Sequence, residues 1–170
     1  MRPKVFSDSR GFFFESWNKD TFSALGIDAD FVQDNQSRSI RNVLRGLHYQ
    51  SGAAAQGKLV WASSGAVFDV MVDLRLDSPT FGKWDACMLT GENCERLWVP
   101  AGCAHGFLVT SDSADFCYKC TAPYHQEAER TIRWDDPELD IHWPLEPGLH
   151  PIVSTKDASG LSWAACEKYK

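Results

Sequence analysis

The stretch AVFDVMVDL (Ala66–Leu74) alternates side chains in the manner of a β-strand. Asp69 and Asp73 share one face with Met71, and the opposite face is entirely apolar. Similar short β-rich segments lie at Lys58–Ala62, Trp84–Leu89, Arg96–Val99 and Gly106–Val109, and turn residues separate them. Several short strands at close spacing predict an all-β sandwich or barrel.

Helix signals are confined to two short segments. Ser16–Leu25 is predicted to form a helix with Asn18 or Asp20 as its cap and Gly26 as its stop. The last residues, Ser159–Lys170, are predicted to form a second one. No repeat, low-complexity tract or linker divides the sequence, so residues 1–170 are expected to form one domain.

The composition excludes several classes of partner. The 17 Lys and Arg against 23 Asp and Glu give a net charge of −6, which disfavours binding to a nucleic-acid backbone. Hydrophobic residues make up 44% of the chain, enough for a packed core. The apolar runs, such as Leu97–Val99, are too short for a membrane span, and residues 1–6 lack the pattern of a signal peptide. We therefore expect no membrane partner and a cytoplasmic location.

The six cysteines include one C-x-x-C pair, Cys117 and Cys120. The pair lies in a β-rich segment, where residues three apart point to opposite faces of the sheet. Neither a shared zinc ion nor a disulfide suits that geometry. Free, reduced thiols are the interpretation that fits a cytoplasmic protein.

Polar residues interrupt the predicted strands at positions that should face inward. Arg45, His48 and Gln50 follow one another along LRGLHYQ (Leu44–Gln50), and the three-residue step from Arg45 to His48 requires a bulge if both are to face one cavity. Lys58, His105 and Tyr118 occupy further strand positions. Each alone is more often a satisfied structural residue; several converging on one interior would form a binding cavity.

The segment PAGCAH (Pro100–His105) resembles the second cupin motif, P-x-G-x-x-H, which implies a double-sheet jelly roll. The first motif of metal-binding cupins has two histidines and a glutamate. Here Gln50, a weak ligand, and Lys58, a cation, stand in that region. The residues thus favour a cupin without a metal, and a metal-dependent cupin remains an alternative.

An ordered set of segments across nearly the whole chain resembles the dTDP-4-dehydrorhamnose 3,5-epimerases, a family of metal-free cupins. Each segment alone is weak, but their order is specific. The matching stretches are Asp8–Glu15, Phe31–Asn35, Val43–Gln50, Gln56–Val60, Ser78–Gly82, Pro100–Phe107, Tyr118–Lys119, Trp134–Pro137 and Ser154–Asp157.

The resemblance implies a cupin-type double-stranded β-helix with a few short helices, a dTDP-sugar substrate, no cofactor and no metal. It implies that His48 is the general base, Asp157 its orienting partner, Tyr118 the general acid and Lys58 the cation near the C4 ketone oxygen. The substrate-contacting positions that it implies are Arg10, Glu15, Gln33, Asn35, Arg45, His105, Tyr124, Glu129 and Lys156. Of these, Tyr124 would stack on the thymine ring. A homodimer in which N-terminal strands pair across the interface is also implied.

The chemistry suits these residue types. The protons on C3 and C5 become removable when the enolate of the neighbouring C4 ketone is stabilised, as a lysine can do. An imidazole titrates near neutrality, and a phenol can return a proton to the opposite face. Arg45 or Arg10 can bind a diphosphate in bidentate fashion. A C3-only epimerase and a non-catalytic cupin that binds sugar nucleotides remain alternatives.

Overall fold

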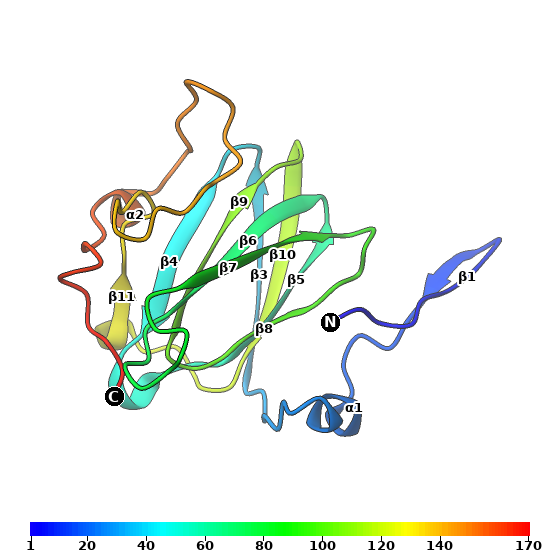
Figure 1. Ribbon diagram of the computed structural model, residues 1–170. Coiled ribbons are helices and arrows are strands. Elements are labelled where there is room, and N and C mark those ends of the chain that lie inside the picture. The colour runs from blue at the N-terminus through cyan, green and yellow to red at the C-terminus, as the bar shows by residue number, and fades with distance from the viewer.

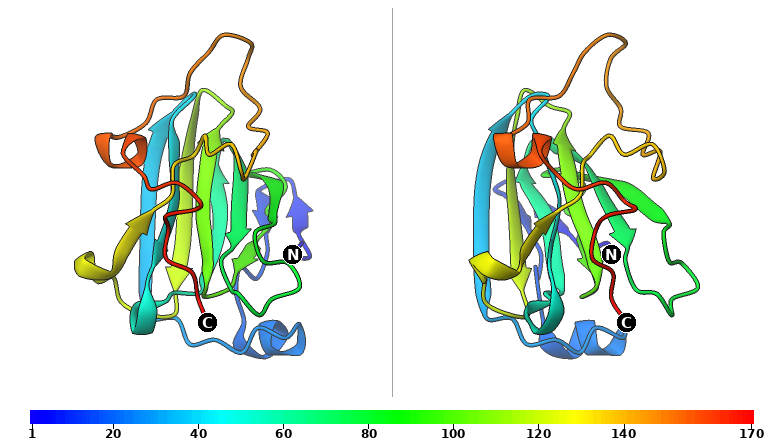
Figure 2. Two further views of the ribbon diagram at one scale, coloured as in Figure 1. Left: turned by 60° about the vertical axis from the view of Figure 1, so that its left-hand side comes forward. Right: turned by 90° about the vertical axis from the view of Figure 1, so that its left-hand side faces the viewer.

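The computed structural model describes residues 1–170, and most of its strands belong to two sheets that pack face to face (Figures 1 and 2). The four-stranded sheet has the order β3 (Gln33–Ile40), β10 (Ser113–Cys120), β5 (Lys58–Ser64) and β8 (Leu97–Val99). The five-stranded sheet has the order β11 (Glu129–Thr131), β4 (Leu44–Gln50), β9 (Cys103–Val109), β6 (Ala66–Asp73) and β7 (Trp84–Thr90). Every neighbouring pair is antiparallel. The predicted all-β jelly roll is confirmed.

Two hydrophobic clusters cover the two faces of the five-stranded sheet. The inner cluster fills the space between the sheets and comprises Val60, Ala62, Val67, Leu89, Val99, Cys103, Phe107, Val109, Ala114 and Phe116. The outer cluster comprises Leu47, Tyr49, Val70, Val72, Leu74, Ala104, Ile132, Leu139 and Cys166. Val67 and Val70 of β6 therefore pack on opposite faces, as the alternation of this strand predicts.

The outer cluster is covered by the C-terminal part of the chain. Figure 2 shows this part, coloured orange to red, running along the outside of the five-stranded sheet. Isolated bridges tie it down, from Leu161 to Ile132 and from Tyr169 to Arg75. The predicted helix at Ser159–Lys170 is wrong, because these residues form turns and bridges whose side chains pack on the sheet. Tertiary packing here overrides a weak helical preference.

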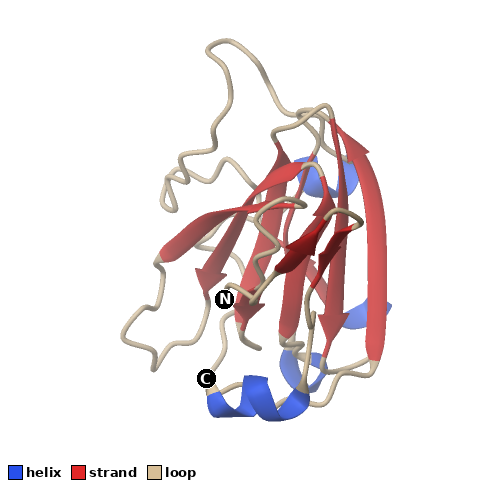
Figure 3. Cartoon of the chain, turned by 90° about the vertical axis from the view of Figure 1, so that its right-hand side faces the viewer, coloured by secondary structure: helices blue, strands red, loops and turns tan.

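Two α-helices lie at the edges of the sheets (Figure 3). The first, α1 (Lys19–Ala24), is shorter than the predicted range Ser16–Leu25. It begins after Asn18, one of the two predicted caps, whose side chain accepts the backbone N–H of Thr21 at 3.1 Å. The second, α2 (Thr155–Ala158), is capped by Ser154. Two short 3-10 turns, η1 (Gly52–Ala54) and η2 (Gln126–Ala128), complete the helical structure. Neither α-helix has the length and apolar character that membrane crossing needs.

The N-terminal hairpin, β1 (Phe6–Asp8) and β2 (Gly11–Phe13), projects away from the two sheets (Figure 1). Its aromatic side chains are exposed, with Phe12 and Phe13 at 63% and 71% of their full accessibility. Its base is anchored by Phe14, whose ring lies 5.2 Å from the guanidinium of Arg96. An exposed aromatic surface of this kind is typical of an interaction site.

Candidate active site

A pocket of about 100 Å³ opens where the two sheets meet, and its lining combines titratable and hydrogen-bonding side chains. Its lining residues are Gln33, His48, Tyr49, Gln50, Gln56, Lys58, Tyr118, Cys120, Tyr124 and Glu129. Six of the residues predicted from the sequence are therefore brought together here: His48, Lys58, Tyr118, Gln33, Tyr124 and Glu129.

The strand register explains why these side chains converge. In the four-stranded sheet β10 pairs with β5, so that Cys120 stands opposite Lys58 and Tyr118 opposite Val60. In the five-stranded sheet β4 carries His48 and Gln50, two residues apart and hence on one face. Because the two sheets face each other, both sets point into the space between them.

A bulge in β4 sets the direction of His48. Arg45 pairs with Phe107 and His48 with His105, so two residues of β4, Gly46 and Leu47, oppose only one of β9. This is the irregularity that the spacing of Arg45 and His48 predicts. A Cβ atom on Gly46 would lie 2.5 Å from the Cα atom of Gly106, so only glycine fits this close approach.

His48 is hydrogen-bonded through Nε2 to Asp157 of α2. The pair joins a strand to a helix over 109 positions of sequence. Asp157 is itself held by Ser154, whose Oγ donates to Oδ2 at 2.8 Å. With the carboxylate accepting from Nε2–H, the other ring nitrogen of His48 is free to accept a proton.

Burial sets the protonation of this pair. It lowers the pKa of His48, and the nearby Asp157 offsets the effect only in part. Burial acts in the opposite sense on Asp157, but the hydrogen bonds from His48 and Ser154, together with the nearby positive charge, outweigh it and hold the pKa of this carboxyl below its ordinary value. The resulting pair is a neutral imidazole beside a carboxylate, which is the arrangement of a general base.

Lys58 and Tyr118 lie on the opposite side of the pocket. The ammonium of Lys58 is 6.0 Å from the centre of the Tyr118 ring. Burial lowers the pKa of Lys58 and raises the pKa of Tyr118. The phenol of Tyr118 therefore stays protonated at neutral pH and is a proton donor.

The outer part of the pocket is a hydrogen-bonded chain around Tyr124. Its hydroxyl donates to Glu129 at 3.2 Å, and Lys156 donates to the other oxygen of Glu129 at 2.8 Å. Gln33 accepts the backbone N–H of Tyr124 at 2.9 Å and donates to Asn35 at 3.1 Å. All five of these predicted substrate-contacting residues thus belong to one network beside His48 and Lys58.

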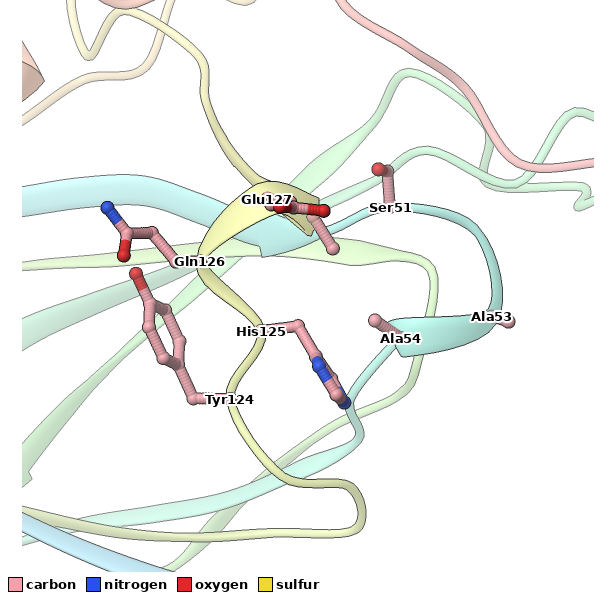
Figure 4. Close-up of a pocket in the computed structure, with 8 residues that line it drawn as sticks. Ser51, Ala53, Ala54, Tyr124, His125, Gln126 and Glu127 are labelled. Carbon is pink, nitrogen blue, oxygen red and sulfur yellow. The ribbon is translucent and has the colours of Figure 1, made fainter.

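Beyond Tyr124 the surface widens into an open hollow of about 700 Å³ (Figure 4). Ser51, Ala53 and Ala54 line one side of the hollow, and the segment Tyr124–Ala128 lines the other. In Figure 4 the ring of His125 points towards Ala54, whereas the ring of Tyr124 lies on the other side of the backbone. Tyr124 therefore stands between the hollow and the smaller pocket, and it lines both.

His105 and Arg45 lie beside the pocket but do not line it. His105 stands directly across from His48 in the β4–β9 pair, and its Nε2 is 3.0 Å from both carboxylate oxygens of Asp69. Both His105 and Asp69 are buried, and burial raises the pKa of Asp69. The exposed Arg45 donates through Nε to Ser39 of β3 at 3.1 Å.

Arg10 and Glu15 are not brought to the pocket. Arg10 lies in the projecting hairpin, where its guanidinium pairs with Asp8 at 2.6 Å. Glu15 follows the hairpin and accepts a hydrogen bond from Asn18 at 3.2 Å. Within one chain, therefore, the structure leaves these two predicted substrate contacts apart from the other eleven predicted site residues.

The structure places three further polar residues in or beside the site; the sequence predicts only that Gln50 faces inward and assigns no role to any of the three. Gln50 and Gln56 line the pocket and are buried, and Asp69 holds His105. A signal exists for Gln50, which follows His48 by two residues and shares its face of the strand. A signal also exists for Asp69, because it is a charged residue within an apolar strand. No signal exists for Gln56, which lies in an alanine-rich loop without a recognisable pattern.

No group of three or more His, Cys, Asp or Glu side chains is arranged to hold a metal ion. The six cysteines are all free, with Cys117 half-buried and Cys120 buried. The thiol of Cys120 lines the pocket and accepts a long contact of 3.8 Å from the Asn35 amide.

Comparisons with known proteins agree on one family. The family model for dTDP-4-dehydrorhamnose 3,5-epimerase matches residues 1–165. The dTDP-4-dehydrorhamnose 3,5-epimerase of Pseudomonas aeruginosa is 56% identical over 165 residues, covering 96% of this chain and 90% of the relative.

Solved structures give the same result. A crystal structure of dTDP-6-deoxy-D-glucose-3,5-epimerase from Legionella pneumophila, in complex with dTDP-4-keto-L-rhamnose, superposes with a TM-score of 0.92 at 51% identity, covering 98% of this chain and 87% of that one. A 3'-monoepimerase from Streptomyces bikiniensis, in complex with dTDP-quinovose, superposes with a TM-score of 0.89 at 33% identity, covering 96% and 82%.

Proposed function

The chain belongs to the dTDP-4-dehydrorhamnose 3,5-epimerase family, and from this premise we propose how its pocket carries out the reaction. The protein is an epimerase that inverts C3 and C5 of dTDP-4-dehydro-6-deoxy-D-glucose, giving dTDP-4-dehydro-L-rhamnose. Both carbons neighbour the C4 ketone, so each inversion removes one proton and returns another through an enolate. Proton transfer alone accomplishes this, and the mechanism calls for no cofactor.

His48 is the general base in this proposal. Its free ring nitrogen accepts the proton from the carbon, and Asp157 stabilises the imidazolium that forms. The lowered pKa of His48 keeps the imidazole neutral, and hence basic, at neutral pH.

Lys58 stabilises the negative charge that develops on the C4 oxygen, and Tyr118 returns the proton from the opposite face. Lys58 is half-buried at the pocket, where a bound sugar would exclude the solvent that otherwise screens its charge, and this makes it an effective donor. The proximity of the two groups, 6.0 Å between the ammonium and the ring centre, supports their action on one bound sugar.

The nucleotide half of the substrate binds at the outer network. Tyr124 stacks on the thymine ring, and Gln33, Asn35, Glu129 and Lys156 surround it. Arg45, which is exposed and linked to β3, is placed to bind the diphosphate. His105, opposite His48 on the neighbouring strand and bonded to Asp69, supports the position of the base. We also assign the enzyme to the cytoplasm, where free thiols such as its six cysteines stay reduced.

The observation that carries this proposal is the convergence of the His48–Asp157 pair, Lys58 and Tyr118 on one pocket. The test is mass spectrometry of dTDP-4-keto-6-deoxyglucose incubated with the protein in heavy water. We expect uptake of deuterium at both C3 and C5, and its loss in His48→Ala. His150→Ala, which changes an exposed loop histidine, is the matched control and should label both carbons.

The other outcomes are equally clear. Deuterium at C3 alone would identify a C3-only epimerase and overturn the double inversion. No uptake by the unmutated protein, despite binding of the nucleotide, would identify a non-catalytic cupin. Unchanged labelling by His48→Ala would remove His48 from the role of base.

We further propose that the active enzyme is a homodimer in which the projecting hairpin of each copy packs against the other. The exposed Phe12 and Phe13 give this hairpin an apolar surface, and Arg10 lies beside them. Pairing across the dimer would carry Arg10 and Glu15 to the pocket of the second copy, which explains why a single chain leaves them apart from it.

Complementation tests this arrangement. Arg10→Ala and His48→Ala are each expected to be inactive alone. After denaturation and refolding together they should regain about a quarter of the activity, since half of randomly formed dimers are mixed and each has one intact site. If Arg10 serves its own chain, the mixture stays inactive. A monomeric mass by light scattering would also contradict the proposal.

A further inference from the structure

Tyr124 lies in an irregular loop. If its ring is to stack on a nucleobase, the loop has to hold the ring in one position. The loop, residues 121–125, runs from the end of β10 to η2 and has no strand or helix partner of its own. The side chain of Tyr124 is close to half exposed, so packing alone does not fix it. Irregular backbone needs other partners for its N–H and C=O groups.

Three glutamines from three separate parts of the chain supply those partners. Gln33 of β3 accepts the N–H of Tyr124 at 2.9 Å. Gln50 of β4 accepts the N–H of His125 at 2.6 Å. Gln56, in the loop before β5, donates to the carbonyl of Ala122 at 2.7 Å. We call these three side chains the glutamine clamp.

The clamp binds backbone groups on both sides of Tyr124. Pro123 has no N–H, so Tyr124 and His125 supply the donors on either side of the Tyr124 ring, and both are bound by a glutamine oxygen. The Gln50 amide also reaches the carbonyl of Pro123, at 3.5 Å. A glutamine suits this work because its amide both donates and accepts.

Burial makes the clamp rigid. Gln50 is 4% exposed and Gln56 is 8% exposed. A buried amide is costly unless its hydrogen bonds are made, so each of these side chains is committed to the loop. The backbone of Gln50 is held as well, because the hydroxyl of Tyr169 donates to its carbonyl oxygen.

The far end of the Tyr124 side chain is held as well. Its hydroxyl donates to Glu129, and Lys156 holds Glu129 in turn. Figure 4 shows the rings of Tyr124 and His125 on opposite sides of the loop, so that the clamped backbone passes between them. The ring is therefore held in one position before a ligand binds. Binding then loses less free energy to the ordering of this side chain.

We propose that Gln50 and Gln56 are positioning residues that fix the Tyr124 ring for the nucleobase of the substrate. This inference rests on the proposed role of Tyr124 in stacking on the thymine ring. The side-chain hydrogen bonds of Gln50 and Gln56 go to the loop that carries Tyr124, so we assign their contribution to nucleotide affinity, in the ground state and the transition state alike. Loss of the clamp raises KM and leaves kcat close to its original value.

The test uses Gln56, which is further from His48 along the chain than Gln50, and dTDP as the probe. Gln56→Met keeps the length of the side chain and removes the donor to Ala122. We expect its Kd for dTDP to rise about 10-fold, the effect of one hydrogen bond of about 1.4 kcal/mol. Gln36→Met is the matched control, since Gln36 is exposed on β3, on the face opposite Gln33, and its amide makes no hydrogen bond; its Kd should be unchanged.

A double-mutant cycle with Tyr124→Ala separates positioning from direct contact. If Gln56 acts through the tyrosine ring, adding Gln56→Met to Tyr124→Ala should change the Kd less than about 2-fold. An equal loss in both backgrounds would show that Gln56 acts on the nucleotide by another route and would overturn the proposal. No loss in either background would overturn it too.

Two further measurements keep the result unambiguous. Circular dichroism checks that each variant is folded; should Gln56→Met not fold, Gln56→Glu, which also lacks the amide donor, is used in the same cycle with the same expectation. If Tyr124→Ala itself binds dTDP normally, the platform role fails and this proposal with it. Heavy-water labelling by the unmutated enzyme reports separately whether the epimerase assignment stands.

Discussion

Two histidine–aspartate pairs lie side by side in this protein, and they differ mainly in burial. His48 and His105 are directly opposed on β4 and β9, and each is bonded to a carboxylate. The side chain of His48 is 26% exposed and its partner comes from α2, outside the sheets. The side chain of His105 is 8% exposed and its partner Asp69 lies on the neighbouring strand β6, fully buried.

The electrostatics of the two carboxylates also differ, although both side chains are buried, because Asp157 has more partners. The pKa of Asp157 is lowered, because its hydrogen bonds outweigh the effect of burial. The pKa of Asp69 is raised, because full burial outweighs His105. One His–Asp pair is therefore suited to exchanging protons at a pocket, and the other to holding a side chain in place.

The largest expected effect is the loss of the pocket-facing imidazole. His48→Ala should lower kcat by about 10²- to 10⁴-fold, the range of a general base, and should lower the thermal stability less than His105→Ala does, because Ser154 still donates to Asp157. Steady-state kinetics and a melting curve measure the two quantities. A kcat within a few-fold of the unmutated enzyme would mean that the two His–Asp pairs do not differ in the way their burial indicates.

The buried His–Asp pair should give the opposite result. His105→Ala leaves the carboxylate of Asp69 buried without its partner, and the loss of one member of such a pair costs about 3–5 kcal/mol of unfolding free energy. Urea unfolding measures this cost, and His150→Ala, at an exposed loop position, should be neutral. A loss of activity at full stability would instead identify His105 as a group that acts on the substrate directly.

Removing the charge of Asp157 sharpens the comparison further. Asp157→Asn retains the imidazole but loses the carboxylate that raises the pKa of His48. We expect a loss in kcat of roughly 10²-fold, the lower end of the general-base range, and a shift of the acid limb of the kcat/KM profile to lower pH. In the unmutated enzyme that limb should already lie below about pH 6.5, the ordinary pKa of histidine, because burial lowers the pKa of His48.

The smallest effect is a pair of opposite pH dependences of stability. The lowered pKa of Asp157 gives a contribution present above the unfolded pKa of about 3.9 and lost as the pH falls through the folded pKa. The raised pKa of Asp69 gives a contribution present below about 3.9 and lost as the pH rises through its folded pKa. Each amounts to about 1.4 kcal/mol for every unit of pKa displacement.

The measurement is the unfolding free energy of the unmutated protein relative to Asp157→Asn and Asp69→Asn between about pH 3 and 8. The advantage of the unmutated protein over Asp157→Asn should grow as the pH rises, and its advantage over Asp69→Asn should shrink. Slopes of the same sign would contradict the assignment of the two carboxylates.

Sequence patterns predict those elements of the fold whose conformation is set by residues close together in the chain. The alternation in Ala66–Leu74 gives β6, the Asn18 cap gives α1, and the spacing of Arg45 and His48 gives the bulge in β4. The predicted helix at Ser159–Lys170 fails because the conformation of that segment depends on the outer face of a sheet formed elsewhere in the chain.

The sequence predicts the site only in part, because some of its contacts join residues that are far apart in the chain. A strand pattern places His48, Lys58 and Tyr118 on inward faces, but nothing local connects His48 to Asp157, 109 positions away. That partnership came from the resemblance to the family. The sequence does not predict the glutamine clamp. The role of the three glutamines follows from their hydrogen bonds to the loop at residues 121–125, and the sequence of that loop has no pattern that predicts its conformation.

The position of Asp157 has a consequence for protein engineering. The acid that orients His48 is delivered by α2, a four-residue helix that belongs to neither sheet. The orienting acid therefore comes from outside the scaffold that carries the base, the proton donor and the lysine. Exchanging Asp157 alone, with Lys156 of the same helix retained for Glu129, should slow turnover while the β-sandwich and the nucleotide-binding network stay intact, a starting point for biosensors that must capture their analyte while consuming it only slowly.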